Sequence, residues 1–94
     1  MLTHIVSFKY KAEVPDNLRQ EHRQRLASLW SVSGVFELKV GADVVGSPRS
    51  FDTGLVVTFK DRAGLDAYGS DPHHVPVAQF GAGICEQIVA VDFE

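Results

Sequence analysis

Four segments of this sequence alternate apolar residues with polar or small ones, and this pattern constrains the fold more than any other feature. The segments are residues 2–10, 35–40, 51–60 and 84–93. A period of two is typical of β-strands that bury one face, because successive side chains point to opposite sides of a sheet. The sequence therefore predicts four strands, of which residues 51–60 show the clearest pattern.

Two helical segments separate these strands. The first begins near Pro15, whose fixed backbone suits a first helical turn, and we expect it to end at Gly34. The second lies between residues 62 and 83 and is interrupted by Gly69 and Ser70. The order strand, helix, strand, strand, broken helix, strand predicts an α+β fold of the ferredoxin-like βαββαβ type. In that fold a four-stranded antiparallel sheet carries its helices on one face.

The two faces of the predicted sheet differ in polarity. The more apolar face should lie under the helices, whereas the other is too apolar for water and too polar for a dry core. A second copy packed on that face would bury it and would help a short chain form enough core, so we expect a face-to-face homodimer. This interpretation assigns Val6, Phe8, Leu38, Leu55, Val57, Val89 and Val91 to the helix side, and Ile5, Val56, Ile88, Ala90, Ser7, Thr58, Glu37 and Lys39 to the dimer side.

Size and composition indicate one ordinary globular domain spanning residues 1–94. Nine basic residues against 12 acidic ones, with a net charge of −3, provide no electrostatic footprint for nucleic acid. No apolar run is long enough to cross a bilayer, and the N-terminus lacks the features of a signal peptide. The single Cys85 excludes an internal disulfide and fits a reducing compartment, so we expect a cytoplasmic location.

The densest group of proton-transfer side chains lies between Tyr68 and His74. Asp71 and Pro72 predict a helix that starts at Pro72, with His73 and His74 in its first turn. A neutral imidazole is favoured there because the positive end of the helix dipole disfavours an added proton. Tyr68 and His74 should face the interior, whereas His73 should point outward, since neighbours on a helix do not share a face. A pocket is one interpretation, and a capped surface turn is the other.

Two further histidines are candidates for the interior. His4 lies on the apolar face of the first strand, either as a structural histidine or as part of a pocket. His22 lies on the helix stripe that carries Leu18 and Leu26, and we expect it at the edge of that stripe, where it reaches water. His4, His22 and His74 lack short metal-ligand spacing, and no phosphate-binding turn is present. We therefore expect neither a metal nor an organic cofactor.

With these residues identified, the chain resembles the stress-responsive dimeric α/β-barrel (Dabb) family over almost its whole length. The resemblance rests on residues 4–9, 51–59, 68–75 and 89–93. Each segment is a weak marker alone, but four in the correct order are specific for the family. Membership implies a dimer whose two sheets form a barrel, with a pocket between each sheet and its helices.

One branch of this family contains polyketide cyclases of the olivetolic acid cyclase type, which close a linear poly-β-ketone by aldol condensation without a cofactor. The resemblance implies that Tyr68 and His74 form an acid/base pair, with His4 nearby. The sequence departs from that branch at Leu26, where the cyclases have an inward tyrosine. It also has Asp71 where a histidine often precedes the proline.

Two functions of different classes follow. The first is a dimeric barrel that holds a small hydrophobic or ketone-like ligand between sheet and helices, as a stress-response-type domain, and this is the interpretation we favour. The alternative is a cofactor-independent acid/base enzyme, a polyketide cyclase-like protein or a related lyase or isomerase. In that enzyme His74 would act as the base, Tyr68 would stabilise or protonate an enolate oxygen, and His4 would orient a partner or the substrate.

Overall fold

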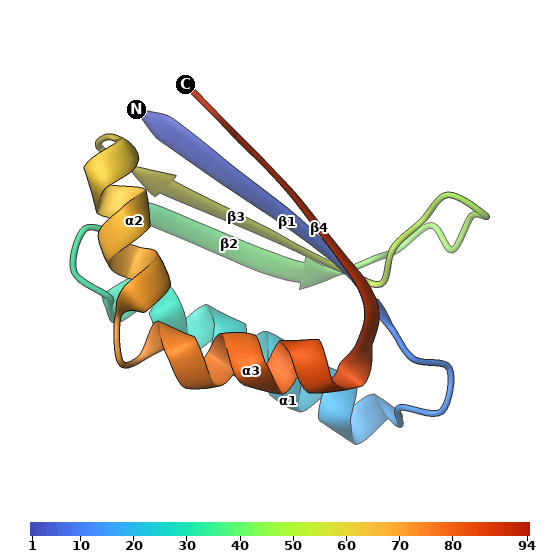
Figure 1. The fold of residues 1–94 in the computed structure, drawn as a ribbon. Helices are drawn as coiled ribbons and strands as arrows, with labels where there is room; N and C mark the ends of the chain where they lie inside the picture. The colour runs from blue at the N-terminus through green and yellow to red at the C-terminus, as the bar shows by residue number, and fades with distance from the viewer.

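The computed structural model describes all of residues 1–94 and contains the predicted order of elements (Figure 1). The four strands form one antiparallel sheet in the order β2-β3-β1-β4, and the helices cover one of its faces. The expected ferredoxin-like α+β fold is confirmed. The elements are β1 (Leu2–Tyr10), α1 (Asp16–Ala27), the short 3-10 helix η1 (Ser28–Ser31), β2 (Glu37–Ala42), β3 (Thr53–Phe59), α2 (Arg62–Ser70), α3 (His74–Ile84) and β4 (Cys85–Phe93).

The first helix is shorter than predicted. Regular α-helix ends at Ala27, and the chain continues as η1, a tighter 3-10 turn that often follows a helix. Gly34 follows two residues after the cap of η1 and has a φ of 93°, in the left-handed region that favours glycine. Gly34 therefore shapes the turn into β2 rather than ending the α-helix itself.

The break between α2 and α3 is built around Asp71. One carboxylate oxygen of Asp71 accepts a hydrogen bond from the backbone N–H of His73 at 2.8 Å. The Asp71 carbonyl accepts from the N–H groups of His74 and Val75 at 2.9 and 3.1 Å. Asp71 thus satisfies the donors at the start of the helix as predicted, although regular helix begins at His74 instead of Pro72.

The core lies between the helices and the inner face of the sheet, which is the face they cover. Leu29 from η1 and Val57 and Phe59 from β3 are completely buried. Burial of this apolar surface is the main force holding the helices on the sheet. The other buried apolar residues are Leu2, Val6, Phe8, Tyr10, Leu26, Val32, Leu55, Tyr68, Val77 and Cys85.

The faces of β4 are opposite to our sequence-based assignment. In the antiparallel ladder Ile88 pairs with Phe8, which is buried in the core, and Val91 pairs with Ile5. Directly paired residues lie on the same face of a sheet, so alternate residues of β4 follow Phe8 or Ile5. Ile88 and Ala90 therefore lie under the helices, and Val89 and Val91 lie on the outer face.

The error has a simple physical reason. Residues 88–91 are all apolar, so the period-two pattern does not distinguish the two faces of this strand. The face is decided by the register against β1, and a shift of one residue reverses every side chain. Here α3 passes directly into β4 at Cys85, which pairs with Tyr10 beside an irregularity in the ladder.

The outer face of the sheet carries an apolar surface open to solvent. Val91 is 55% exposed and Phe93 is 50% exposed, and both belong to β4, while Val56 from β3 is 36% exposed. Ile5 on β1 lies between these two strands. The expectation of an apolar outer face thus holds with Val89, Val91 and Phe93 in place of Ile88 and Ala90. None of the helices combines the length and the apolar character that crossing a membrane demands.

Candidate active site

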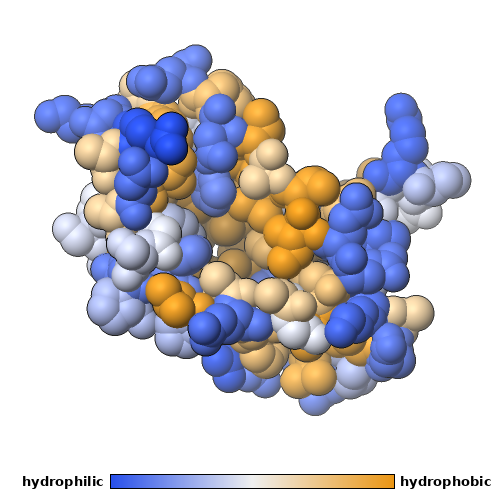
Figure 2. All heavy atoms as spheres, in the orientation of Figure 1, coloured by the Kyte–Doolittle hydropathy of each residue, from blue (hydrophilic) through white to orange (hydrophobic).

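A cavity of about 260 Å³ lies between the inner face of the sheet and the helices. Figure 2 shows the molecule hollowed between the sheet and the helix layer, with hydrophobic atoms gathered around the hollow. The cavity wall is mostly apolar, with imidazole and phenol groups as its main polar features. It is formed by His4, Val6, Phe8, His22, Leu26, Leu55, Tyr68, His74, Val77, Ala78, Gly81, Ile88 and Ala90.

The structure brings His4, Tyr68 and His74 to this cavity from three different elements. The ring centroids of Tyr68 and His74 are 4.3 Å apart, and those of His4 and Tyr68 are 6.2 Å apart. His4 comes from β1, Tyr68 from the last turns of α2 and His74 from the start of α3. The three residues proposed from sequence therefore form one group of neighbouring rings.

The surroundings of His74 determine which ring nitrogen is free. Nδ1 of His74 lies 3.1 Å from the carbonyl oxygen of Gly69, which only accepts, so Nδ1 carries the proton and donates it. Burial lowers the pKa of His74, and the charge of His4 acts in the same direction, against the Gly69 hydrogen bond and Asp71. A neutral ring with its proton on Nδ1 leaves Nε2 with a lone pair that can accept a proton.

Tyr68 is buried with its hydroxyl unsatisfied. It is only 2% exposed, and its oxygen has no hydrogen-bond partner in the protein. Burial raises the pKa of Tyr68 to about 12, so the phenol keeps its proton at neutral pH. Buried polar groups normally find a partner, and those left without one often serve a bound molecule. Tyr68 thus presents an unpartnered O–H donor on a ring whose centroid is 4.3 Å from that of His74.

His4 is held by a residue that the sequence did not reveal. Its Nδ1 donates to a carboxylate oxygen of Asp92, which stands directly opposite His4 in the β1–β4 ladder. This contact orients the ring and makes Nδ1 the protonated nitrogen. The sequence-based assignment of Ile88 and Ala90 to the outer face also puts Asp92 there, on the opposite face from His4. The correct register of β4 against β1 would have paired the two residues.

His22 is not at the edge of its helix, as we had expected, but completely buried. Its Nδ1 lies 2.8 Å from the hydroxyl of Tyr10, which in turn lies 2.8 Å from the hydroxyl of Thr53. A guanidinium nitrogen of Arg23 donates to the same Thr53 hydroxyl at 3.0 Å. Tyr10 ends β1 and Thr53 begins β3, so the network exists only when the helix packs on the sheet. Sequence patterns carry no signal for it.

The remaining histidine lies outside the cavity. Nε2 of His73 is 3.1 Å from the hydroxyl of Ser28, on the surface between α3 and η1. His73 thus points away from His74, as predicted for neighbours on a helix. The structure contains no group of three or more His, Cys, Asp or Glu side chains arranged to hold a metal ion.

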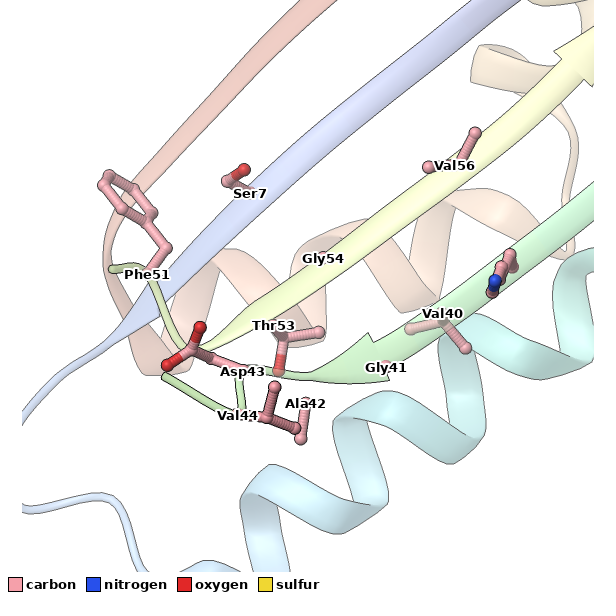
Figure 3. Close-up of a pocket in the computed structure, with 11 residues that line it drawn as sticks. Ser7, Val40, Gly41, Ala42, Asp43, Val44, Phe51, Thr53, Gly54 and Val56 are labelled. Atoms are coloured by element: carbon pink, nitrogen blue, oxygen red, sulfur yellow. The ribbon is translucent and has the colours of Figure 1, made fainter. Parts of the chain in front are cut away.

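A second, larger hollow of about 550 Å³ lies on the outer side of the sheet at the β2–β3 hairpin. Figure 3 shows Ser7 and Val56 beside Gly54, together with Phe51 and Asp43 from the hairpin connection. Gly41 and Gly54 pair across β2 and β3, so no side chain fills the outer face at that point. The hollow contains no imidazole or phenol, and it belongs partly to the outer face. The smaller inner cavity is the better candidate for chemistry.

A four-stranded antiparallel sheet with a helix layer on one face places the chain among the ferredoxin-like α+β proteins. The chain belongs to the stress responsive A/B barrel domain (Dabb) family, whose profile matches residues 2–94. No match was found among curated proteins. The resemblance seen in the sequence is therefore confirmed for the family.

Solved structures show the same fold. A dimeric ferredoxin-like protein of unknown function from Thermobifida fusca YX is 22% identical, with a TM-score of 0.89, over 98% of this chain and 88% of its own. A dimeric ferredoxin-like protein from Jannaschia sp. CCS1, also of unknown function, is 26% identical, with a TM-score of 0.82, over 99% and 97%. A hydroxynitrile lyase from Passiflora edulis is 21% identical, with a TM-score of 0.86, over 98% and 90%. These likenesses establish the fold of the monomer.

Proposed function

We propose that this protein binds a small, largely apolar carbonyl compound in the inner cavity and catalyses proton transfer next to the carbonyl without a cofactor. The observation that carries the proposal is the pairing of two complementary groups in one cavity. His74 offers an unprotonated Nε2 because its Nδ1 is bonded to Gly69 at 3.1 Å, and Tyr68 offers an unpartnered buried hydroxyl. A base and a hydrogen-bond donor side by side suit enolate chemistry.

In the proposed step, Nε2 of His74 removes a proton from the carbon next to the carbonyl. The C–H bond breaks, an N–H bond forms, and the electron pair moves to the carbonyl oxygen to give an enolate. The O–H of Tyr68 donates a hydrogen bond to that oxygen, which stabilises the developing charge. Return of the proton from His74 restores the ketone. In the alternative outcome, the enolate attacks a second carbonyl of the same molecule, a C–C bond forms and closes a ring, and the resulting alkoxide takes the proton from His74.

His4 has a supporting role in this proposal. Its ring is 6.2 Å from that of Tyr68, and the Asp92 carboxylate fixes its orientation. A bound carbonyl compound would meet His4 on the side of the cavity opposite α3. We propose that His4 positions the substrate, while His74 and Tyr68 contact the reacting atoms.

The cavity restricts the substrate class. Its volume of about 260 Å³ lies just below the usual range of ligand pockets, roughly 300–1,000 Å³, which favours a small molecule. Apolar residues such as Val6, Leu55 and Val77 line it, so the substrate should be mainly hydrocarbon or aromatic. A polyketide cyclase-like reaction fits this description. One structural relative is a hydroxynitrile lyase, so lyase chemistry on a small molecule is the related candidate.

A non-catalytic ligand-binding domain is the second candidate. The same apolar cavity and the same unpartnered Tyr68 hydroxyl would hold a ketone without reaction. For either function we propose a cytoplasmic homodimer joined through the outer face of the sheet. The exposed Val56, Val91 and Phe93 on that face and the dimeric relatives support this assembly.

Hydrogen exchange tests the proposal without knowledge of the natural substrate. Small methyl ketones and 1,3-diketones would be incubated with the protein in D2O, and loss of the protons next to the carbonyl would be followed by NMR. We expect the protein to accelerate exchange above the buffer rate. His74→Ala should reduce the enzymatic rate by on the order of a hundredfold or more, the usual contribution of a general base.

His73→Ala is the matched control, because it removes the adjacent imidazole, which lies outside the cavity and contacts Ser28. This variant should keep the wild-type rate. If the protein binds a ketone without accelerating exchange, the ligand-binding function is correct and the catalytic one is wrong. Equal rates for wild type and His74→Ala would likewise end the catalytic proposal.

A further inference from the structure

His22, one of the residues that line the cavity, has one buried polar atom without a partner in the protein. The residue is completely buried, its Nδ1 is bonded to Tyr10, and its Nε2 has no hydrogen-bond partner in the protein. Only glycine suits the neighbouring position 81, because a Cβ added there would stand 2.8 Å from Nε2. His22 and Gly81 both line the cavity that contains His74 and Tyr68.

The hydrogen-bond network determines which nitrogen of His22 carries the proton. The Thr53 hydroxyl accepts a hydrogen bond from Arg23. Its own proton is therefore donated to the Tyr10 hydroxyl, which is its other hydrogen-bond partner. The Tyr10 hydroxyl then donates to Nδ1 of His22. Burial lowers the pKa of His22 to about 4, and the charge of Arg23 adds to the effect, so the ring is neutral at pH 7. In that neutral ring the proton lies on Nε2.

The two ends of the cavity therefore differ in chemistry. His74 begins α3 and Gly81 lies seven residues further along it, which at a helical rise of 1.5 Å per residue separates them by about 10 Å. At the first end stand the basic Nε2 of His74 and the Tyr68 hydroxyl. At the second end the Nε2–H of His22 is a donor only. Apolar side chains lie between the two ends.

We propose that His22 is a second ligand-binding residue, whose Nε2–H donates a hydrogen bond to an oxygen at the far end of the substrate. The natural ligand is then a molecule with two oxygen functions, a carbonyl near His74 and an acceptor oxygen about 10 Å away. This inference rests on the proposed function for the position of the carbonyl, and it names a substrate class that the His74 end alone does not define.

A purely structural role for His22 explains less of the geometry. The hydrogen bond from Tyr10 satisfies Nδ1, but leaving a buried N–H unpaired costs about 1–3 kcal/mol. A phenylalanine would fill the same space beside Phe8 without that cost, since the two rings already meet edge to face at 4.8 Å between centroids. A bound acceptor removes the cost, and glycine at position 81 keeps a side chain away from the nitrogen.

The test uses two ketones that differ only at the far end, nonan-2-one and 9-hydroxynonan-2-one. Their dissociation constants would be measured by NMR titration of the wild-type protein and of His22→Phe, which keeps an aromatic ring and removes Nε2–H. We expect His22→Phe to weaken binding of the hydroxyketone about threefold to tenfold, the equivalent of one ordinary hydrogen bond. Binding of nonan-2-one should change by less than about twofold.

Equal weakening of both ketones would show that His22 only packs against the ligand, and no change for either would show that it does not contact the ligand. Both results overturn the inference. Failure of the proposed catalytic function is a separate outcome. In that case neither ketone exchanges its protons, yet the hydroxyketone still loses affinity in His22→Phe.

A measurement on the wild-type protein covers the case in which His22→Phe does not fold. The ¹⁵N resonances of the His22 ring should show a protonated Nε2 before ligand is added. The Nε2 resonance should then shift with 9-hydroxynonan-2-one and stay unchanged with nonan-2-one. A proton on Nδ1, or an identical response to both ketones, would contradict the inference.

Discussion

Nδ1 of His74 lies 3.1 Å from the carbonyl oxygen of Gly69, the residue directly after Tyr68. The proposed base is thus tied to the backbone that carries the proposed acid, across the break between α2 and α3. Gly69 lies in the last turn of α2, where carbonyl groups lack helical partners, so its oxygen is free to accept from the ring. The broken helix therefore sets both the tautomer of His74 and its distance from Tyr68.

The Tyr68 hydroxyl offers a direct separation of function from stability. Tyr68→Phe removes an oxygen that has no partner and keeps the buried ring, which packs on Phe59 with 5.0 Å between centroids. We expect the free energy of unfolding to stay the same or to rise by up to about 1 kcal/mol, because a buried unsatisfied hydroxyl is lost. Ketone proton exchange should fall roughly tenfold to a hundredfold, since one donor to the enolate disappears.

Urea denaturation and the NMR exchange assay would measure the two quantities on the same samples. A clear loss of stability in Tyr68→Phe would mean that the hydroxyl has a structural partner, such as an ordered water. If Tyr68→Phe exchanges the ketone protons at the wild-type rate, the Tyr68 hydroxyl takes no part in the mechanism.

Asp92 should matter for activity more than for stability. Asp92→Asn keeps the size of the side chain and weakens its contact with His4, whose ring then loses its fixed orientation. The Asp92 side chain is 36% exposed, and partly exposed ion pairs contribute less than about 1 kcal/mol, so unfolding should change little. We expect exchange to fall several-fold. Asp66→Asn, which breaks an exposed pair with Arg62 outside the site, is the control and should leave exchange unchanged.

Stability should fall in mild acid because of His22. Burial lowers its pKa to about 4 in the folded protein, against an ordinary value of 6.5, so the unfolded chain binds a proton that the native state rejects. This contribution is complete above pH 6.5 and is lost as the pH falls toward 4, by on the order of a few kcal/mol. The lowered pKa of His74 acts in the same direction.

Free energies of unfolding at pH 7 and pH 4.5 would test this for wild type, His22→Phe and His73→Ala. The loss between the two pH values should be smaller in His22→Phe. The His73→Ala control should resemble wild type, since this imidazole is on the surface. An equal loss in all three proteins would mean that groups other than His22 cause the acid sensitivity.

The outer face predicts the assembly. Light scattering should give roughly twice the chain mass of 10.3 kDa, because Val56, Val91 and Phe93 form an apolar surface that a second sheet would cover. Val56→Asp should produce a monomer with lower stability, since the charge would be desolvated without a partner. Val45→Asp is the control, because Val45 is 74% exposed in the hairpin connection, away from the strands. A monomeric wild-type protein at micromolar concentration would contradict the prediction.

Local patterns in the sequence determined a large part of this structure. Period-two alternation located the four strands, and proline and aspartate located the helix starts to within about two residues and the break at Asp71. These signals are readable because they arise from steric and hydrogen-bonding preferences of neighbouring residues. The same periodicities predicted that His4, Tyr68 and His74 point inward, and all three line the cavity.

Only the tertiary structure decided the features that depend on register and packing. Residues 88–91 are all apolar, so the alternation pattern does not show which β4 residues face the helices, and the pairing of β4 with β1 decides it. The same pairing places Asp92 opposite His4, which is far from it in the sequence. Likewise, the apolar stripe of the helix predicted that His22 lies on it, but it carried no information on the hydrogen bonds that link His22 to Tyr10 and Tyr10 to Thr53. Periodicity reports which residues share a face of one element, whereas the depth of a residue and its polar partners depend on how separate elements fit together.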